Sequence, residues 1–430
     1  MMKPVTKWNT SLPKAEVVPE AVRKAFKIAQ TEKPGSTHLE LPEDVADDLA
    51  NDVHARLPLL VQAPTTLEPV PSQITRAVQA IAAGKHPVIL AGNGTVRGGA
   101  SDAVRQFARR LQIPVLHTFM AKGVMADSDP LSLYTLGLQD RDYASIVMEQ
   151  ADVVITVGYD VVEYAPCFWN PQRDKHIVHV DLSPAEVDEH YLVEIEVLGD
   201  LRFSLDLIGS KLAPFHPSWS AACRRTVITG FEDEHTDSAS WPLHPQYLLQ
   251  ELRAVLEPDD IVICDVGAHK LWMARMFPCE RPNSCIISNG FAAMGISLPG
   301  AIAAKLLFPR RRIVAVTGDG GFLMNSQELE TAVRLALPLI IVIWRDDGYG
   351  VIRWKQQVRF GRTAAVEFGN PDLIEYAQSF GATGYRVADP SELRPILMKA
   401  CTAGGPTVID CPMDYRANLR LTERLHQLAR

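Results

Sequence analysis

The stretch from Ala315 to Lys355 reads AVTGDGGFLMNSQELETAVRLALPLIIVIWRDDGYGVIRWK. A short apolar strand ends in Gly318-Asp319-Gly320, a helix-like segment follows, and a second apolar strand runs from Leu339 to Trp344. This order predicts one βαβ unit of a parallel sheet. Ligands of open parallel sheets bind beyond the carboxyl ends of the strands, and the acidic residues Asp319 and Asp346-Asp347 both follow such ends. We therefore expect the functional site there.

The acidic residues fit a metal-bound diphosphate. Glycines on both sides of Asp319 let backbone N–H groups approach an anion, and a carboxylate between them can hold a hard divalent cation such as Mg²⁺. Asp346 follows 27 residues later, a separation that one crossover helix spans, so both carboxylates can reach one ion. The alternative is that Asp319 closes a turn and Asp346-Asp347-Gly348 forms a surface turn, because turns and ligand loops share a composition.

The wider pattern resembles a known family. Gly318-Asp319-Gly320, followed by Asp346 and by Gly348-Tyr349-Gly350, resembles the cofactor-diphosphate motif of thiamine diphosphate enzymes. GDGGF at 318–322, ELETA at 328–332 and the segment 344–350 are most similar to acetolactate synthases. The resemblance continues through AGNGTVRGGAS at 91–101, TFMAKGV at 118–124 and VGYDVVEY at 157–164. The chain is identified as a member of this family, most similar to its catabolic, flavin-free branch.

Alternating helices and strands predict the fold class. The segments 74–212 and 246–430 each read as an α/β domain with a doubly wound, flavodoxin-like parallel sheet. Proline-rich stretches without periodicity predict irregular linkers at 49–73 and 213–245. Residues 1–48 hold one expected helix and one expected strand, which resemble the end of the family's pyrimidine-binding domain. The resemblance implies that most of that domain lies outside this sequence.

Composition narrows the function classes. The chain has 430 residues, of which 47% are apolar and 22% charged, as in globular proteins of two to three domains. A net charge of −8 argues against a nucleic-acid or anionic-membrane surface. Seven cysteines without a C-x-x-C pair indicate neither a zinc site nor a disulfide framework. With no long apolar run and no apolar leader, we expect a soluble cytoplasmic protein.

The resemblance implies a site for thiamine diphosphate and Mg²⁺ on three loops of the last domain. Its implied metal ligands are Asp319, Asp346 and the backbone carbonyl of Gly348. Met294, at the start of an expected helix Met294–Leu306, matches the residue that holds the two cofactor rings in a V shape. The implied cofactor-binding residues are Val266, Gly267, His269, Ala292, Met294, Gly318, Asp319, Gly320, Gly321, Asp346, Gly348, Tyr349, Gly350 and Val351.

Some of these residues have ordinary structural interpretations as well. A lone histidine after a strand, such as His269, is commonly a helix cap or a surface residue. An unbranched thioether such as that of Met294 fills core gaps well. Gly92-x-Gly94 suits a dinucleotide turn, but it also suits a plain strand-to-helix turn.

Three departures from the family pattern stand out. Arg345 replaces a frequent Asn, and a cation there would either pair with a phosphate or repel the metal. Members that hold flavin adenine dinucleotide carry Arg-Phe-Asp-Asp-Arg where this chain has Tyr159 to Tyr164, so FAD is not expected. The glutamate that activates the cofactor lies in the family's pyrimidine-binding domain. No residue of this sequence matches it, so the catalytic group is left unassigned.

The implied function is that of an acetolactate synthase: thiamine diphosphate-dependent decarboxylation of pyruvate and condensation with a second 2-oxo acid, by a homodimer or homotetramer. Trp354, Lys355, Gln356 and Gln357 follow the cofactor loop where the family's acceptor-side residues lie, with the tryptophan offset by one position. One alternative is another thiamine diphosphate lyase, similar to benzoylformate decarboxylase. A second alternative is an inactive cofactor-binding fragment that lacks the activating glutamate.

Overall fold

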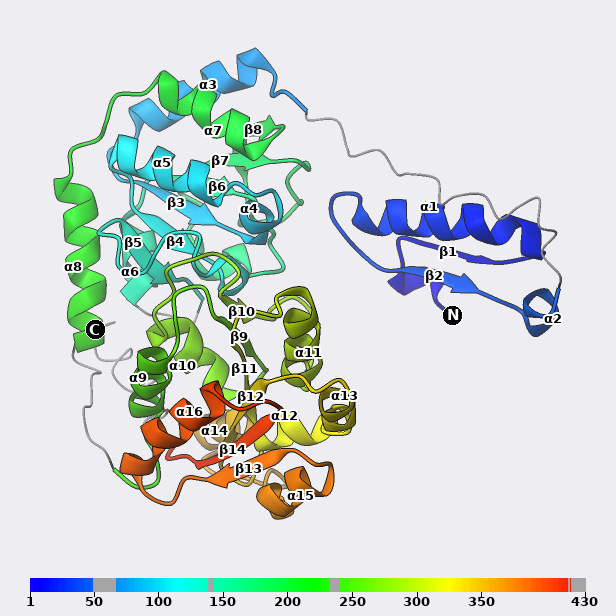
Figure 1. The fold of residues 1–430 in the computed structure, drawn as a ribbon. Coiled ribbons are helices and arrows are strands. Elements are labelled where there is room, and N and C mark those ends of the chain that lie inside the picture. Colours follow the sequence, from blue (N-terminus) through cyan, green and yellow to red (C-terminus); the bar gives the residue numbers. More distant parts are fainter. Residues whose placement is uncertain (49–66, 138–142, 233–239, 417, 419–430) are drawn as a thin grey trace.

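Two parallel sheets dominate the structure, a computed structural model that describes residues 1–48, 67–137, 143–232, 240–416 and 418. Each sheet has six strands, and helices cover both faces of each (Figure 1). A small unit formed by residues 1–48 lies beside them (Figure 1). The predicted α/β class with two doubly wound parallel sheets is confirmed.

The central sheet has the strand order β5-β4-β3-β6-β7-β8, with all neighbours parallel. Its strands are β3 (Pro87–Ala91), β4 (Val115–His117), β5 (Ser132–Thr135), β6 (Val153–Val157), β7 (His176–Asp181) and β8 (Val193–Leu198). One face packs against α3 (Pro71–Ala83), α5 (Ser101–Leu111) and α7 (Leu201–Ser210). The other face packs against α6 (Tyr143–Gln150) and α8 (Ser218–Glu232). Because β3 and β6 are covered on both sides, every residue in them is buried.

The last sheet has the strand order β10-β9-β11-β12-β14-β13, again all parallel. Its strands are β9 (Ile261–Cys264), β10 (Cys285–Ile287), β11 (Ile313–Gly318), β12 (Leu339–Arg345), β13 (Thr383–Arg386) and β14 (Thr407–Pro412). Helices α9 (Pro245–Val255), α10 (Ala268–Met276) and α16 (Leu393–Cys401) cover one face. Helices α11 (Ser297–Leu307), α13 (Glu328–Arg334) and α15 (Leu373–Ser379) cover the other. Two more helices, α12 (Asp319–Met324) and α14 (Gly350–Phe360), start just beyond strand ends.

Both sheets contain a point where the strand order reverses. In the central sheet it lies between β3 and β6, and in the last sheet between β9 and β11. Segments that leave neighbouring strands at such a point turn to opposite faces and open a crevice between them. The loops after β9 and β11 carry His269 and Asp319, so the fold itself brings these two predicted site residues together.

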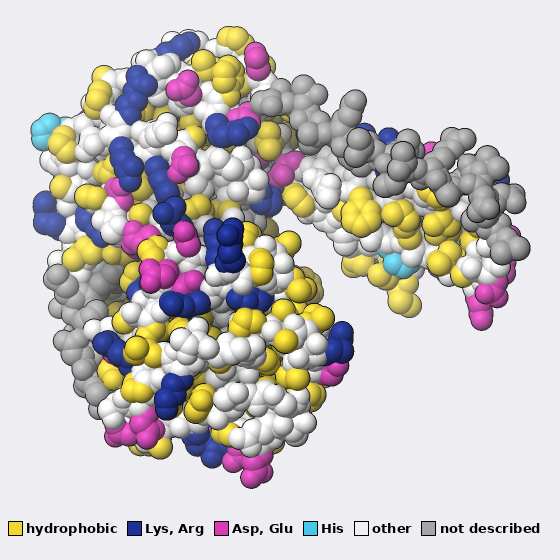
Figure 2. Space-filling model, viewed as in Figure 1, with side chains coloured by type: hydrophobic (Ala, Val, Ile, Leu, Met, Phe, Trp, Pro, Cys, Tyr) yellow, Lys and Arg dark blue, Asp and Glu magenta, His cyan; other side chains and the backbone are white. Residues whose placement is uncertain are grey.

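The N-terminal unit holds one strand more than expected. Strand β1 (Trp8–Ser11) pairs in parallel with β2 (Thr37–Glu40) beneath helix α1 (Val18–Gln30), so the expectation of a single strand is wrong. Strand β1 lacks a regular alternation of apolar and polar residues, so it gave no period-2 signal. The unit has little core of its own, and apolar side chains show at its surface (Figure 2). Lys33 ties it to the central domain through ion pairs of 3.1 Å to Asp160 and 2.8 Å to Glu186.

Two further expectations need correction. The stretch 213–245 is not wholly irregular, because α8 lies within it and buries Cys223 and Val227 against the central sheet. The helix expected from Met294 begins at Ser297, since residues before it form a turn. Of the expected first linker, residues 49–66 lie outside the described residues, and α3 already begins at Pro71. The domain boundaries themselves stay predictions.

A buried ion pair joins the central domain to the last domain. The Lys122 ammonium lies 3.0 Å from an Asp127 carboxylate oxygen and donates a hydrogen bond of 3.1 Å to the carbonyl of Ala274 in α10. Asp127 also accepts the backbone N–H of Cys279 at 2.9 Å. Lys122 and Asp127 are only 1% and 3% exposed. Removing one partner would therefore leave the other charge unpaired away from water.

We predict that Lys122→Met lowers the free energy of unfolding by about 3–5 kcal/mol, because it leaves the Asp127 carboxylate buried without its cation. The double variant Lys122→Met/Asp127→Asn removes both charges, so its loss should be smaller than that of Lys122→Met alone. Urea denaturation followed by circular dichroism measures both. A double variant that is less stable than Lys122→Met would contradict the pairing.

Candidate active site

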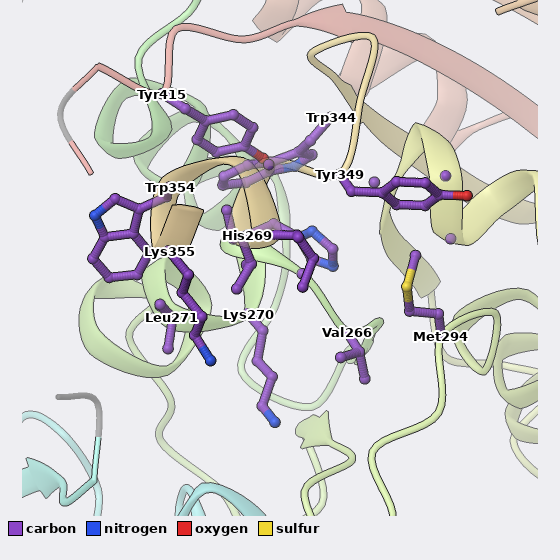
Figure 3. A pocket seen from close by; sticks show the side chains of 18 of the residues that line it. Val266, His269, Lys270, Leu271, Met294, Trp344, Tyr349, Trp354, Lys355 and Tyr415 are labelled. Atoms are coloured by element: carbon purple, nitrogen blue, oxygen red, sulfur yellow. The ribbon is translucent and has the colours of Figure 1, made fainter. Parts of the chain in front are cut away.

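A cavity of about 1060 Å³ lies at the carboxyl ends of β9, β11 and β12. The loops that follow these three strands form one wall (Figure 3). The central domain contributes Phe119, Gly137, Tyr164 and Phe168 to the lining. The cavity therefore lies between the two domains, which is a common position for ligand sites.

All but one of the predicted cofactor-binding residues line this cavity, as do Trp354 and Lys355 but not Gln356 and Gln357. Ala292 is the exception: it does not line the cavity, and its backbone adopts the left-handed conformation with φ of 53°. The residues that do line it are Val266, Gly267, His269, Met294, Gly318, Asp319, Gly320, Gly321, Asp346, Gly348, Tyr349, Gly350 and Val351. The spacing argument that linked the GDG turn to Asp346 thus describes one real site, and its assignment to a cofactor stays a prediction.

Asp319 is fixed by hydrogen bonds on both carboxylate oxygens. One oxygen accepts the backbone N–H of Gly320 at 2.8 Å. The other accepts the backbone N–H of Asp347 and the side-chain amide of Asn370, both at 2.8 Å. Burial raises the pKa of Asp319 even though these donors favour the charged form. Asn370 gave no signal in the sequence, because it lies 51 residues from Asp319.

Asp346 is the less saturated of the two carboxylates. Burial, reinforced by the charge of Asp319, raises the pKa of Asp346 to about 7. Among the residues that the structure describes, its carboxylate pairs with Arg353, whose guanidinium lies 3.3 Å away. A Cβ at position 350 would lie 2.7 Å from the Asp346 carboxylate, so Gly350 lets the start of α14 pass close to it. A bound cation would relieve the repulsion between Asp319 and Asp346.

Arg345 pairs with two carboxylates of the protein. Its guanidinium lies 2.9 Å from the buried Asp410 carboxylate and 3.1 Å from Asp347. Arg386 pairs with the other oxygen of Asp410, also at 2.9 Å. These carboxylates hold Arg345 at the end of β12, where it stabilises the loop that carries Asp346. Arg345 is also absent from the cavity lining.

His269 presents an unsatisfied nitrogen in the cavity wall. It is 2% exposed, and its Nε2 has no hydrogen-bond partner among the residues that the structure describes. Burial lowers the pKa of His269 to about 4, opposed by the nearby Asp265, so the ring is neutral near pH 7. A neutral imidazole can still donate one N–H to a ligand. The surface-residue interpretation of His269 is therefore wrong.

The N-terminus of α14 also opens on the cavity. No side chain caps this helix, and its first residues Gly350, Val351 and Ile352 all line the cavity. The first N–H groups of a helix have no partner inside the helix, and the helix dipole favours an anion there. Gly350 donates its N–H to the carbonyl of Gly348 at 3.1 Å, so Val351 and Ile352 of this 11-residue helix would supply the N–H donors that a metal-bound phosphate needs.

The loop before α11 is held by a buried carboxylate. The buried carboxylate of Asp265 accepts the backbone N–H groups of Gly295 at 2.9 Å and Ser297 at 3.0 Å. These amides are thus satisfied by protein and are not free for a cofactor. Met294 stands just before them, half-buried, and its side chain extends toward the Tyr349 ring in the view of Figure 3. The position suits contact with a ligand better than a place in the core.

Several lining residues gave no signal in the sequence. Trp344 ends the buried part of β12, and Tyr415 stacks on it with ring centroids 6.3 Å apart (Figure 3). Tyr415 follows β14, so both come from neighbouring strand ends. Lys270 on α10 and Phe119 after β4 were missed as well. Only the three-dimensional arrangement brings these separate segments together.

A further buried carboxylate, that of Glu163, lies at the reversal point of the central sheet. It is 4% exposed, accepts the backbone N–H of Asn93 at 2.9 Å and accepts the Thr118 hydroxyl at 2.5 Å. A Cβ at position 94 would lie 2.7 Å from the Cα of Gly158, so the Gly92-x-Gly94 turn serves a close backbone crossing. Glu163 thus occupies the place where a dinucleotide phosphate would meet such a turn.

Burial raises the pKa of Glu163 to about 7, although the Thr118 and Asn93 donors oppose the shift. An unfolded glutamate titrates near pH 4.3, so the folded protein binds the extra proton between these values and loses stability as pH rises through them. Replacing Glu163 by Gln removes this titration. We expect the free energy of unfolding of E163Q, relative to that of the wild type, to increase by on the order of 2 kcal/mol from pH 5 to pH 8. Urea denaturation at each pH measures this difference.

The exposed Glu189 offers a matched control for this prediction. Its side chain is 71% exposed and pairs with Arg173 on the surface of the same domain. Glu189→Gln should follow the wild-type pH profile throughout. Parallel profiles for E163Q and the wild type would contradict the raised pKa of Glu163.

Matches to two protein families define the class of protein to which this chain belongs. Residues 74–208 match the family described as thiamine pyrophosphate enzyme, central domain. Residues 265–411 match the thiamine pyrophosphate enzyme, C-terminal TPP binding domain. The cavity thus lies between domains of two families that occur together in thiamine pyrophosphate enzymes.

Individual relatives narrow the class. An acetolactate synthase of Bacillus subtilis is 36% identical over 427 residues, which are 98% of this chain and 74% of the relative. A catabolic acetolactate synthase of Raoultella terrigena is 33% identical over 99% of this chain and 77% of the relative. A probable acetolactate synthase large subunit of Methanococcus aeolicus is 31% identical over 98% and 74%. The chain belongs to the acetolactate synthase family of thiamine pyrophosphate enzymes.

Two other results bear on the site and its setting. Within the described ranges, no group of three or more His, Cys, Asp or Glu side chains is placed to hold a metal ion by itself. A site of two carboxylates and one carbonyl would need further oxygen ligands from a bound diphosphate. The helices that the structure describes include none with the length and apolar character needed to cross a membrane.

Proposed function

We propose that the protein condenses two 2-oxo acids, with pyruvate as the donor that loses CO₂, on thiamine diphosphate held through Mg²⁺. The observation that carries this proposal is the convergence of Asp319, Asp346, His269 and the α14 N-terminus on one cavity at a reversal point of the sheet. The relatives' names, acetolactate synthase and catabolic acetolactate synthase, supply the reaction.

The residues fit the diphosphate end of the cofactor. His269 offers an unpartnered buried nitrogen, and α14 offers uncapped N–H groups, so phosphate oxygens would find donors on two sides. Asp319, Asp346 and the carbonyl of Gly348 would hold Mg²⁺ against the diphosphate. Met294 and the apolar part of the lining would contact the rings. When bound, thiamine diphosphate supplies the electron sink that takes up the charge left as CO₂ departs.

The protein's own residues prepare this site in three ways. Asn370 and the amides of Gly320 and Asp347 fix Asp319 so that it does not turn away when the cavity is empty. The lowered pKa of His269 keeps its ring uncharged. The ring would therefore donate one hydrogen bond to a phosphate without adding a cation that competes with the metal. Phe119, Tyr164 and Phe168 cover the cavity from the central domain and would keep water from the reacting carbons.

We propose further that the protein holds no flavin and that it assembles as a multimer. Glu163 already meets the amide of Asn93, and this supports a central domain that takes no dinucleotide phosphate at its glycine turn. The family relation supports a homodimer or homotetramer. The group that activates the cofactor's pyrimidine ring is not assigned to any described residue.

Cofactor binding should require the metal. Two carboxylates and a diphosphate at close range repel one another by several kcal/mol, about 4 kcal/mol for each pair of unit charges 4 Å apart near a protein surface. We expect calorimetric titration with thiamine diphosphate to show binding with Mg²⁺ and none after chelation. Asp346→Asn should weaken binding at least about 100-fold, while Asp319→Ala should abolish it, because Asp319 also orders the loop.

Asp347→Asn serves as the matched control for these substitutions. It removes the same charge one residue away, but the Asp347 side chain faces Arg345 and does not line the cavity. Its cofactor affinity should stay within about threefold of the wild type. Metal-independent binding, or equal losses in all three variants, would remove the basis for the metal assignment.

The reaction itself is tested with the purified full-length protein, thiamine diphosphate, Mg²⁺ and pyruvate. We expect acetolactate and CO₂ in equal amounts. Release of CO₂ without acetolactate would instead favour a simple decarboxylase, the benzoylformate decarboxylase-like alternative. Cofactor binding without release of CO₂ would favour a non-catalytic role.

A further inference from the structure

Lys270 is a buried lysine in the wall of the cavity. It lies on α10, directly after His269, and is 8% exposed. Its ammonium donates a short hydrogen bond to the side-chain oxygen of Asn289 and lies 4.8 Å from the centre of the Phe119 ring. In Figure 3 the side chain extends away from Trp344 and Tyr415. The charge is thus held between α10, the loop after β10 and the central domain.

This charge lacks an acidic partner among the residues that the structure describes. Lys122, the other buried lysine of this interface, is paired with Asp127, and its pKa is raised overall although burial lowers it. At Lys270 only Asn289 and the Phe119 ring meet the ammonium, and burial lowers its pKa. An unpaired cation in an apolar cavity is costly, and an anionic ligand would offset that cost.

Asn289 holds the lysine in one orientation. Its amide nitrogen donates a 2.6 Å hydrogen bond to the backbone carbonyl of Glu163. The amide oxygen is therefore directed toward Lys270. This leaves further N–H groups of the ammonium for a ligand, because a lysine carries three donors. The arrangement fixes the position of the charge before any substrate enters.

We propose that Lys270 binds the carboxylate of the acceptor 2-oxo acid. This inference rests on the proposed function and deepens it by assigning a substrate group to one residue. In the overall reaction two pyruvates and one proton give acetolactate and CO₂. The donor's bond to its carboxylate breaks, its former carbonyl carbon bonds to the acceptor's carbonyl carbon, and the acceptor oxygen gains the proton. The acceptor carboxylate passes unchanged into the product.

Electrostatics favours the acceptor over the donor as the partner of Lys270. A cation that holds the donor carboxylate would stabilise the charge that must leave it as CO₂ forms, and so would raise the barrier. A cation that holds the acceptor carboxylate meets the same charge before and after the bond forms. It therefore orients the acceptor without opposing the reaction.

The test uses Lys270→Met, which keeps the length and apolar stem but removes the charge, and Lys270→Arg, which keeps the charge. We expect Lys270→Met to raise the KM for the acceptor about 10- to 100-fold, the range for a lost hydrogen bond between charged groups. CO₂ release should then exceed acetolactate formation. With acetaldehyde, an acceptor without a carboxylate, the rate of acetoin formation should stay as in the wild type. Lys270→Arg should recover part of the acceptor affinity.

Lys305→Met is the matched control for removal of a buried lysine charge. Lys305 is 7% exposed, its pKa is likewise lowered by burial, and its ammonium donates to the carbonyl of Arg311 away from the cavity. This variant should keep the wild-type preference between pyruvate and acetaldehyde. A loss of preference in Lys305→Met as well would overturn the assignment, because any buried charge would then act alike.

A binding measurement separates this inference from the proposed function. Oxamate, an unreactive analogue of pyruvate with the same carboxylate, is titrated into wild type and Lys270→Met, both with thiamine diphosphate and Mg²⁺. Weaker binding by Lys270→Met supports the carboxylate site even in a protein that forms no acetolactate, and that result would count against the proposed function alone. Equal oxamate binding, or equal losses with pyruvate and with acetaldehyde as acceptor, would overturn the assignment of Lys270.

Discussion

Repulsion between two buried carboxylates governs the site. Asp319 is 1% exposed, and it helps to raise the pKa of Asp346 to about 7. Folding alone offers them few counter-charges, and Arg353 supplies the one side-chain ion pair that the structure gives Asp346. The surrounding residues position these two carboxylates. Asn370 and nearby amides fix Asp319, and the α14 N-terminus approaches Asp346. The Arg345–Asp410 pair holds the end of β12, from which the loop with Asp346 starts. This arrangement supports the proposed binding of a cation together with an anion.

Much of this site follows from local sequence. The apolar runs before Asp319 and Asp346 identify β11 and β12, and the position of ligands at strand ends then brings both residues to one edge. Local patterns cannot supply Asn370, Tyr415 or Phe119, because each reaches the cavity from a distant segment. The family resemblance added His269 and Met294, whose residue types alone fit ordinary structural roles.

The errors have identifiable physical causes. Strand β1 has only four residues and no regular alternation, so no period-2 pattern emerges. Prolines at both ends of the segment 213–245 indicated an irregular linker and gave no sign of helix α8, although Cys223 and Val227 pack in the core. The helix expected from Met294 begins later because the residues before α11 are held by Asp265, 30 residues from Gly295, and nothing local reveals this contact. In each case a tertiary contact decided the structure.

The carboxylate of Glu163 at the glycine turn of the central domain also has a thermodynamic consequence. A group attached to the same chain is presented at an effective concentration in the millimolar range or above, so a dissolved nucleotide would have to outcompete a permanent occupant. The turn keeps the geometry of a ligand site while the chain's own carboxyl group accepts the N–H of Asn93. The proposed absence of flavin would make assembly of this domain independent of the nucleotide pool of the cell.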